Sequence, residues 1–140
     1  MGIDKVAISR KQISVETPLI TTEITDNCLY SGFFGSLDST RVAEIADKIT
    51  LACEAQQFEY IIIDLGNVEA IDSAVATHLL RLGDVLSLIG VQPIFCGIHG
   101  MLARTMVASG VSMGHMKTVA NLKSALKLCY ELSGLELVKK

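Results

Sequence analysis

The chain has 140 residues, of which 50% are hydrophobic and 19% charged, and its formal net charge is -3. These values fit one globular domain that buries a core without disulfide staples, since a chain of this length hides roughly two thirds of its unfolded surface. The Lys and Arg residues are thinly spread, so the composition argues against DNA or RNA as a partner.

The N-terminus and the cysteines indicate the compartment. Residues 1–10 lack the long apolar core of a signal peptide, and no segment holds about 18 uncharged apolar residues. The cysteines lie scattered in apolar stretches without a CxxC pair, which favours buried free thiols in a reducing compartment; they are Cys28, Cys53, Cys96 and Cys129. We therefore expect a cytoplasmic protein that does not contact membranes.

The first half of the chain predicts a hairpin, a helix and a buried strand. Residues 18–24 and 28–34 are typical of two strands joined by a turn at Asp26 and Asn27. Residues 39–53 place apolar side chains at helical spacing. A strand over residues 60–65 follows, and its three consecutive isoleucines indicate that both faces of the strand are covered.

A short acidic loop then leads to a helix predicted over residues 73–89. Asp72 is the expected N-cap, and Ser73 takes the first helical position. The free backbone donors and the dipole of that first turn favour negative charge, so a phosphate on Ser73 could be accommodated there. The residues alone favour an ordinary, well-capped helix start over a modification site.

The second half alternates short strands with helices. Residues 97–100 are expected to form a flexible link, and the other predicted elements are a strand over 91–96, a helix over 101–109, a strand over 117–119 and a helix over 121–133. Helices between strands act as crossovers, which parallel strand pairs require. The sequence therefore predicts an α/β fold with a mixed sheet of four or five strands and about four helices.

Short motifs spread along the chain occur in the order and with the loop lengths of a known family. They are Thr17-Pro18, Gly35 to Arg41, Ile63-Asp64, Ile71-Asp72-Ser73, His78 and Gly97-Ile98 through Thr105. Together they resemble a STAS domain over residues 14–134, and in particular the antagonist and co-antagonist proteins of bacterial stressosomes. The resemblance implies the STAS fold, with residues 1–13 as an N-terminal extension and 135–140 as a C-terminal tail.

The resemblance also implies a function by modification. In this family a serine/threonine switch kinase phosphorylates the hydroxyl that follows the strand-to-helix loop, and Ser73 matches that position. Thr105 matches the second acceptor of co-antagonists, and Asp64 and Asp72 are expected to flank the Ser73 phosphosite. Serine at this position is common in plain antagonists and threonine in co-antagonists, so the sequence leaves the subtype open.

The implied partners are the switch kinase and other STAS-domain antagonists, in a homo-dimer or a larger assembly. The unmodified protein is expected to sequester the kinase until it becomes phosphorylated, without catalysing a reaction itself. Whether a sensor domain precedes the STAS domain in a longer natural protein is left open by the sequence, as are the signal and the downstream output.

A small ligand-binding or enzymatic α/β domain, with a pocket near His78 or His99, is the alternative. A Ser/His/Asp hydrolase is disfavoured, because Ser73 and His78 lie five positions apart on one helix and point in directions that differ by roughly 140°. The Gly-x-Ser-x-Gly elbow, the ligand spacing of a metal site and the glycine pattern of a phosphate loop are all missing from the sequence. We therefore expect no enzymatic activity, no metal and no cofactor.

Overall fold

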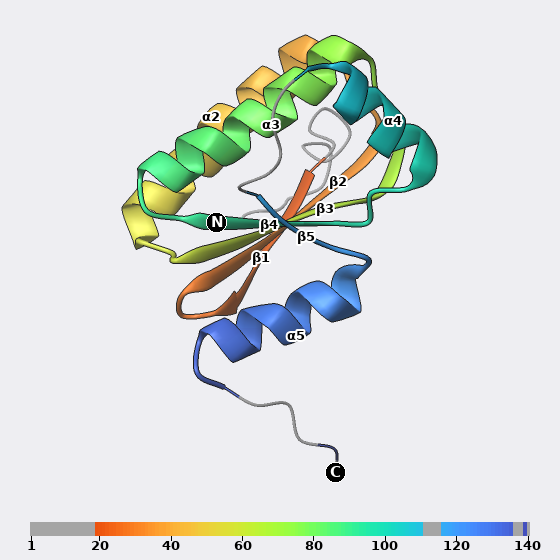
Figure 1. Cartoon of the computed structure of the whole chain (residues 1–140). Helices are drawn as coiled ribbons and strands as arrows, with labels where there is room; N and C mark the ends of the chain where they lie inside the picture. The colour runs from red at the N-terminus through yellow and green to blue at the C-terminus, as the bar shows by residue number, and fades with distance from the viewer. Residues whose placement is uncertain (1–18, 111–115, 136–138, 140) are drawn as a thin grey trace.

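The computed structural model describes residues 19–110, 116–135 and 139 of the chain (Figure 1). In chain order its elements are β1 (Leu19–Thr25), β2 (Cys28–Ser36), α2 (Ser39–Gln56), β3 (Tyr60–Ala70), α3 (Ser73–Leu88), β4 (Gln92–Cys96), α4 (Gly100–Ala108), β5 (Lys117–Val119) and α5 (Leu122–Leu132). The extension predicted for residues 1–13 lies outside the described residues, as does Pro18 at the start of the first predicted strand.

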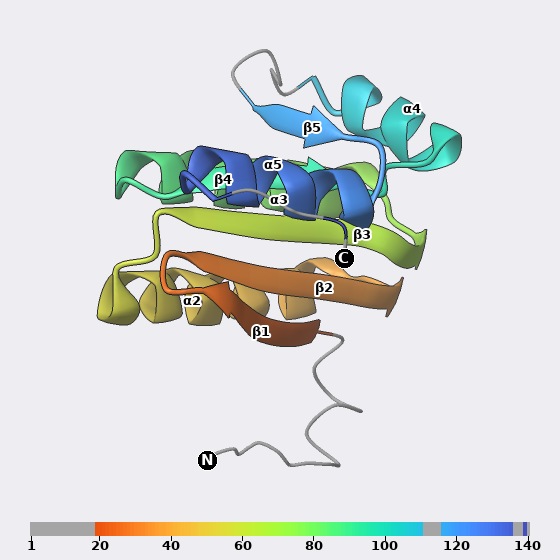
Figure 2. The ribbon, with the colours of Figure 1, turned by 90° about the horizontal axis from the view of Figure 1, so that it is seen from below.

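The strands of the described residues form one five-stranded sheet in the order β1-β2-β3-β4-β5. β1 pairs antiparallel with β2, and the remaining neighbours pair in parallel. Helices α2, α3 and α4 cover one face of the sheet, and α5 covers the other (Figures 1 and 2). The predicted α/β fold, with a mixed sheet and about four helices, is therefore confirmed.

Strand β3 runs through the middle of the sheet and is buried on both faces, as its isoleucines predict. Ile61 and Ile63 belong to the larger apolar core beneath α2 and α3, whereas Ile62 belongs to the smaller core beneath α5. β3 is longer than predicted, however, because residues 66–70 continue to pair with the end of β2 through register shifts. The expected acidic loop is thus largely strand, since pairing with a neighbour overrides the weak strand propensity of residues such as Gly66 and Asn67.

Three helices begin at the same end of the sheet, because α2, α3 and α4 each follow one of the parallel strands β2, β3 and β4. Their N-caps are Asp38, Asp72 and His99. The partial positive charges of three helix N-termini therefore gather at this end of the molecule, which favours negative charge there.

The cysteines do not all behave as the sequence predicts. The structure pairs Cys28 on β2 with Cys129 on α5 as a disulfide between residues 101 positions apart, while Cys53 and Cys96 are free and buried. The prediction of free thiols is confirmed for Cys53 and Cys96 and wrong for the other two. Packing of α5 on the sheet brings Cys129 onto Cys28 in the smaller core, a tertiary contact that spacing along the chain does not reveal.

Cys53 and Cys96 are expected to resist thiol reagents in the folded protein. Burial raises the pKa of Cys53 to about 11. Burial, and to a smaller extent the nearby Asp64 carboxylate, raises the pKa of Cys96 to about 12. Both thiols stay neutral at pH 8, and the thiolate is the reactive form. Without reductant, iodoacetamide should add no group to the folded chain and two groups in denaturant, as read by intact mass. Labelling of all cysteines in denaturant would contradict the disulfide.

Candidate functional site

Ser73 is the first residue of α3, and its side chain is exposed. Within the residues that the structure describes, its hydroxyl makes no hydrogen bond. The position combines an accessible oxygen with the free backbone donors of a helix N-terminus, as the sequence predicts. The hydroxyl is therefore available to a modifying enzyme without breaking an existing contact.

Hydrogen bonds to Asp72 and to Ser73 itself hold the turn that carries Ser73. The Asp72 carboxylate accepts a hydrogen bond of 2.8 Å from the Val75 backbone N–H, and the Asp72 carbonyl accepts one from Ala76. The Thr77 hydroxyl donates to the Ser73 carbonyl at 2.9 Å. The predicted N-cap is confirmed, and it fixes the Asp72 side chain beside Ser73.

Thr105 lies in the second half of α4, away from that helix's N-terminus. Its half-buried side chain donates a hydrogen bond of 3.2 Å to the Met101 carbonyl. Phosphorylation there would break this bond and place negative charge where the helix dipole opposes it. Helix α4 packs against α3, so the two predicted acceptors lie on neighbouring helices in very different electrostatic surroundings.

Asp64 is buried in the sheet, and its carboxylate has partners of its own. The Tyr30 hydroxyl donates to one oxygen at 2.7 Å, and the Gly66 backbone N–H donates to the other at 2.9 Å. Burial, with Asp64 adding to the effect, raises the pKa of Tyr30 above its ordinary value, so the phenol stays protonated and donates. Asp64 therefore links the middle of β3 to β2, and its predicted place beside a phosphate stays a prediction.

Replacing Tyr30 with Phe is expected to lower the free energy of unfolding by about 1–3 kcal/mol, because it leaves a buried carboxylate oxygen without its donor. Asp64 is only 8% exposed, so water does not readily take over this role. Urea denaturation measures the change. Tyr130→Phe is the matched control, since the Tyr130 hydroxyl has no hydrogen bond within the described residues and its loss should cost under about 0.5 kcal/mol. Equal costs for the two variants would contradict the role of the pair.

The segment predicted as a flexible link is a tightly packed contact instead. Gly97 has a φ of 76°, and a Cβ built on it would lie 2.5 Å from the backbone nitrogen of Gly66 and 2.7 Å from its Cα. The chain leading to α4 therefore packs directly on β3 beside Asp64. Sequence reasoning missed this contact, and the only signal for it is that Gly66 and Gly97 each follow the regular part of a parallel strand.

His99 joins the same two elements. It is the N-cap of α4: its Nδ1 accepts a hydrogen bond of 3.4 Å from the Leu102 backbone N–H, and its Nε2 lies 3.4 Å from the Val68 carbonyl oxygen on β3. His78 instead lines a cavity of about 480 Å³ between α2 and α3, and Asp47 and Arg81 line the same cavity. His99 is not part of that lining, so the structure does not bring the two histidines of the alternative function together.

Metal-ligand clusters and membrane-spanning helices are both missing from the part of the chain that the structure describes. Over residues 19–110, 116–135 and 139, no group of three or more His, Cys, Asp or Glu side chains is arranged to hold a metal ion. Within the same ranges, none of the helices has the length and apolar character needed to cross a membrane.

The comparisons with known proteins agree on the family. The family model described as the STAS domain matches residues 20–125. A curated relative is the RsbT co-antagonist protein RsbRB of Bacillus subtilis (strain 168), which is 29% identical over 114 residues. The match covers 81% of this chain and 40% of the relative, so the chain spans less than half the length of that protein.

Solved structures show the same fold at low sequence identity. Moorella thermoacetica RsbS has a TM-score of 0.71 and 20% identity, and the match covers 85% of this chain and 98% of that one. A chain from a structure described as "Molecular architecture of the stressosome, a signal integration and transduction hub" has a TM-score of 0.66 and 20% identity. The match covers 81% of this chain and 98% of that one. The STAS family model and the co-antagonist relative confirm the resemblance seen in the motifs, and the solved structures confirm the fold.

Proposed function

The chain belongs to the STAS domain family, and on that premise we propose that it is a phosphorylatable regulatory scaffold of a stressosome-type partner-switching pathway. In its unmodified state it assembles with other STAS domains and sequesters a serine/threonine switch kinase. Phosphorylation of Ser73, and in a second step of Thr105, releases the kinase. The relative named as an RsbT co-antagonist and the stressosome chain of the same fold support this proposal.

The single observation that carries the proposal is the state of Ser73. Its hydroxyl is exposed and makes no hydrogen bond within the described residues, yet it stands on a helix start that Asp72 holds in place. A kinase needs an accessible hydroxyl on a defined backbone, and a phosphate gains stabilisation from the helix N-terminus.

The negative charge of the phosphate is the proposed cause of kinase release. A phosphoserine at neutral pH adds about -1.5 to -2 charges and three strong acceptor oxygens. Ser73 lies directly after Asp72, and the nearby Glu69 is exposed on β3. The phosphate therefore enlarges an acidic surface while the helix start stabilises it, and a partner that fits the unmodified surface closely is repelled.

The geometry gives no support to hydrolysis at Ser73. A serine nucleophile needs a base within hydrogen-bond reach, and in the described structure neither His78 nor His99 bonds to the Ser73 hydroxyl; His99 is occupied with Leu102 and Val68. We accordingly propose a substrate of a kinase rather than an enzyme.

Intact mass after incubation with ATP and a cognate switch kinase tests the proposal. We expect one phosphate on wild type at early times, localised to Ser73 by peptide mapping, and none at that site in Ser73→Ala. Ser39→Ala is a matched control, because Ser39 also follows an Asp that caps a helix at the same end of the sheet. Undiminished early phosphate in Ser73→Ala, or loss of phosphate in Ser39→Ala alone, would refute the assignment of Ser73.

A further inference from the structure

The two edges of the sheet differ in how they are protected. β5 is three residues long and begins with Lys117, and short, lysine-bearing edges resist pairing with other strands. β1 is seven residues long and, among the described strands, pairs only with β2. It contains neither Lys nor Pro, and its Ile20 side chain is 56% exposed. An edge of this kind is a template for a further strand.

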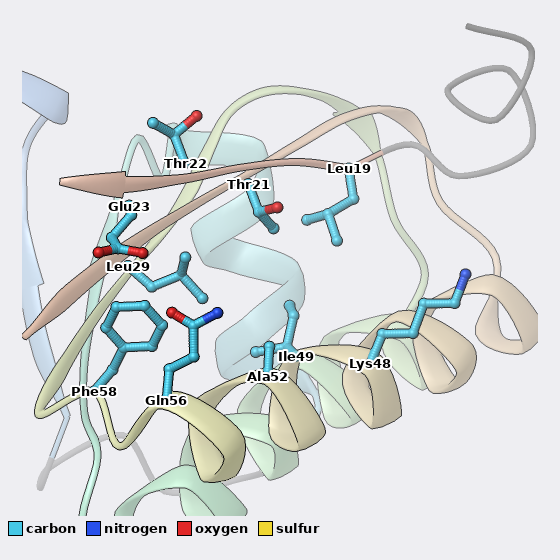
Figure 3. A pocket seen from close by; sticks show the side chains of 10 residues that line it. All are labelled: Leu19, Thr21, Thr22, Glu23, Leu29, Lys48, Ile49, Ala52, Gln56 and Phe58. Atoms are coloured by element: carbon cyan, nitrogen blue, oxygen red, sulfur yellow. The ribbon is translucent and has the colours of Figure 1, made fainter. Parts of the chain in front are cut away.

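A groove of about 360 Å³ lies beneath β1, between that strand and α2 (Figure 3). Its floor is apolar, with Leu29, Ile49, Ala52 and Phe58 below the strand. Leu19, Thr21 and Glu23 point from β1 into the groove, as Figure 3 shows. The edge strand and the apolar groove therefore form one continuous surface.

The groove carries opposite charges at its two ends. Lys48 on α2 lies at the Leu19 end, and Glu23 lies at the other end, close to Phe58 (Figure 3). Neither Lys48 nor Glu23 makes an ion pair or a side-chain hydrogen bond with the residues described by the structure. Both charges are thus available to a partner.

This arrangement is complementary to itself. In a two-fold symmetric, antiparallel pairing centred on Thr21, the Glu23 of one copy lies opposite the Leu19 of the other, beside Lys48 of that other copy. Side chains alternate along a strand, so Leu19, Thr21 and Glu23 of both copies face the same side of the joined sheet. Each groove then receives the acidic residue of the opposite copy at its basic end.

We propose that a second copy of this chain docks on β1 by antiparallel β1–β1 pairing, and that two symmetric Lys48–Glu23 ion pairs fix the register. The pairing satisfies edge backbone groups of β1 that have no partner strand within residues 19–110 and 116–135, and it joins the two sheets into one. This surface lies along the edge of the sheet, whereas Ser73 lies at the ends of the parallel strands. The proposal therefore does not depend on phosphorylation or kinase binding.

A charge exchange on the full chain tests the ion pairs, with the dimer dissociation constant measured by analytical ultracentrifugation at low salt. Glu23→Lys and Lys48→Glu should each weaken the dimer about tenfold or more, because each places like charges together. The double variant should return to within about threefold of wild type, since the pair is restored in reverse. Lys123→Glu on α5, at the opposite face, should leave the constant unchanged.

A cross-link tests the register without relying on charge. In the proposed pairing the two Thr21 residues face each other, and directly opposite residues of antiparallel strands have Cα atoms about 4.5–5.5 Å apart, within disulfide range. Thr21→Cys should give a covalent dimer on oxidation, and Lys123→Cys should not. A monomer at every concentration would overturn the proposal, even if a small amphiphile binds in the groove. So would a dimer that neither single charge variant weakens, or a double variant that is not rescued.

Discussion

Replacing Ser73 with Asp is expected to weaken kinase capture by about tenfold or more, whereas Ser73→Ala should capture the kinase as wild type does. The alanine variant removes a hydroxyl that makes no hydrogen bond within the described residues, so the folded surface stays intact. The aspartate adds a negative charge directly beside Asp72 at the start of α3. A tenfold change corresponds to about 1.4 kcal/mol, which is within reach of one like-charge contact at an interface.

Surface-immobilised kinase and purified variants give the dissociation constants for this comparison. The difference between the two variants should shrink at high salt, because exposed charges are screened over about 8 Å at physiological ionic strength and over less at higher salt. Ser39→Asp adds the same charge at the first residue of α2, behind an Asp cap of the same kind, and should leave capture near wild type. Equal capture by Ser73→Asp and Ser73→Ala would count against release by charge.

Replacing Gly97 with Ala is expected to destabilise the fold more than the same change at Gly90. Both glycines have positive φ, 76° and 90°, so both variants carry the left-handed penalty of about 1–2 kcal/mol. Only Gly97 has a neighbour in the way, since its Cβ would lie 2.5 Å from the Gly66 backbone nitrogen, whereas nothing lies within 4 Å of the Cβ at Gly90. Overpacking of this kind costs typically about 1–3 kcal/mol more.

Chemical denaturation gives the free energy of unfolding of each variant. The difference between the two variants separates the cost of the close contact from the cost of the left-handed backbone. Because Gly97 and Gly66 join the approach to α4 with the strand that leads to Ser73, Gly97→Ala should also lower the thermal midpoint clearly below that of Gly90→Ala. If both variants lose the same stability, the close approach of Gly97 to Gly66 does not add to the cost of the substitution, which would contradict the expected contact.

The regular parts of the fold could be predicted because local patterns and tertiary packing agree there. The isoleucines of β3 indicate a doubly covered strand, and Asp72 indicates the start of α3; both features are found in the structure. The extension of β3 through residues 66–70 could not be predicted in the same way. Those residues are weak strand formers, and their pairing depends on β2, which lies far away in sequence.

Contacts between distant segments account for the other differences. Cys28 and Cys129 meet only because α5 packs on the second face of the sheet, and Gly97 meets Gly66 only because β3 and β4 are neighbours in register. A periodic pattern carries no information on such encounters. The same limit applies to Asp64, whose carboxylate is held by Tyr30 from the adjacent strand.

The candidate site was only half predictable from physical chemistry. The capping residues locate Ser73 at a helix start, and the structure confirms that geometry. A helix start does not specify a kinase, however, so the function rests on the family and on the exposure of the hydroxyl. Thr105 shows the difference, because its place in the second half of α4 gives a phosphate no help from the helix dipole.

The most direct test of the central claim is a single time course that follows phosphate and kinase together. The immobilised chain is loaded with a cognate switch kinase, ATP is added, and the released kinase and the phosphate on the Ser73 peptide are quantified in the same samples. We predict that release rises in proportion to phosphate on Ser73 and is absent in Ser73→Ala. Release that runs ahead of Ser73 phosphorylation, or that persists in Ser73→Ala, would contradict the account.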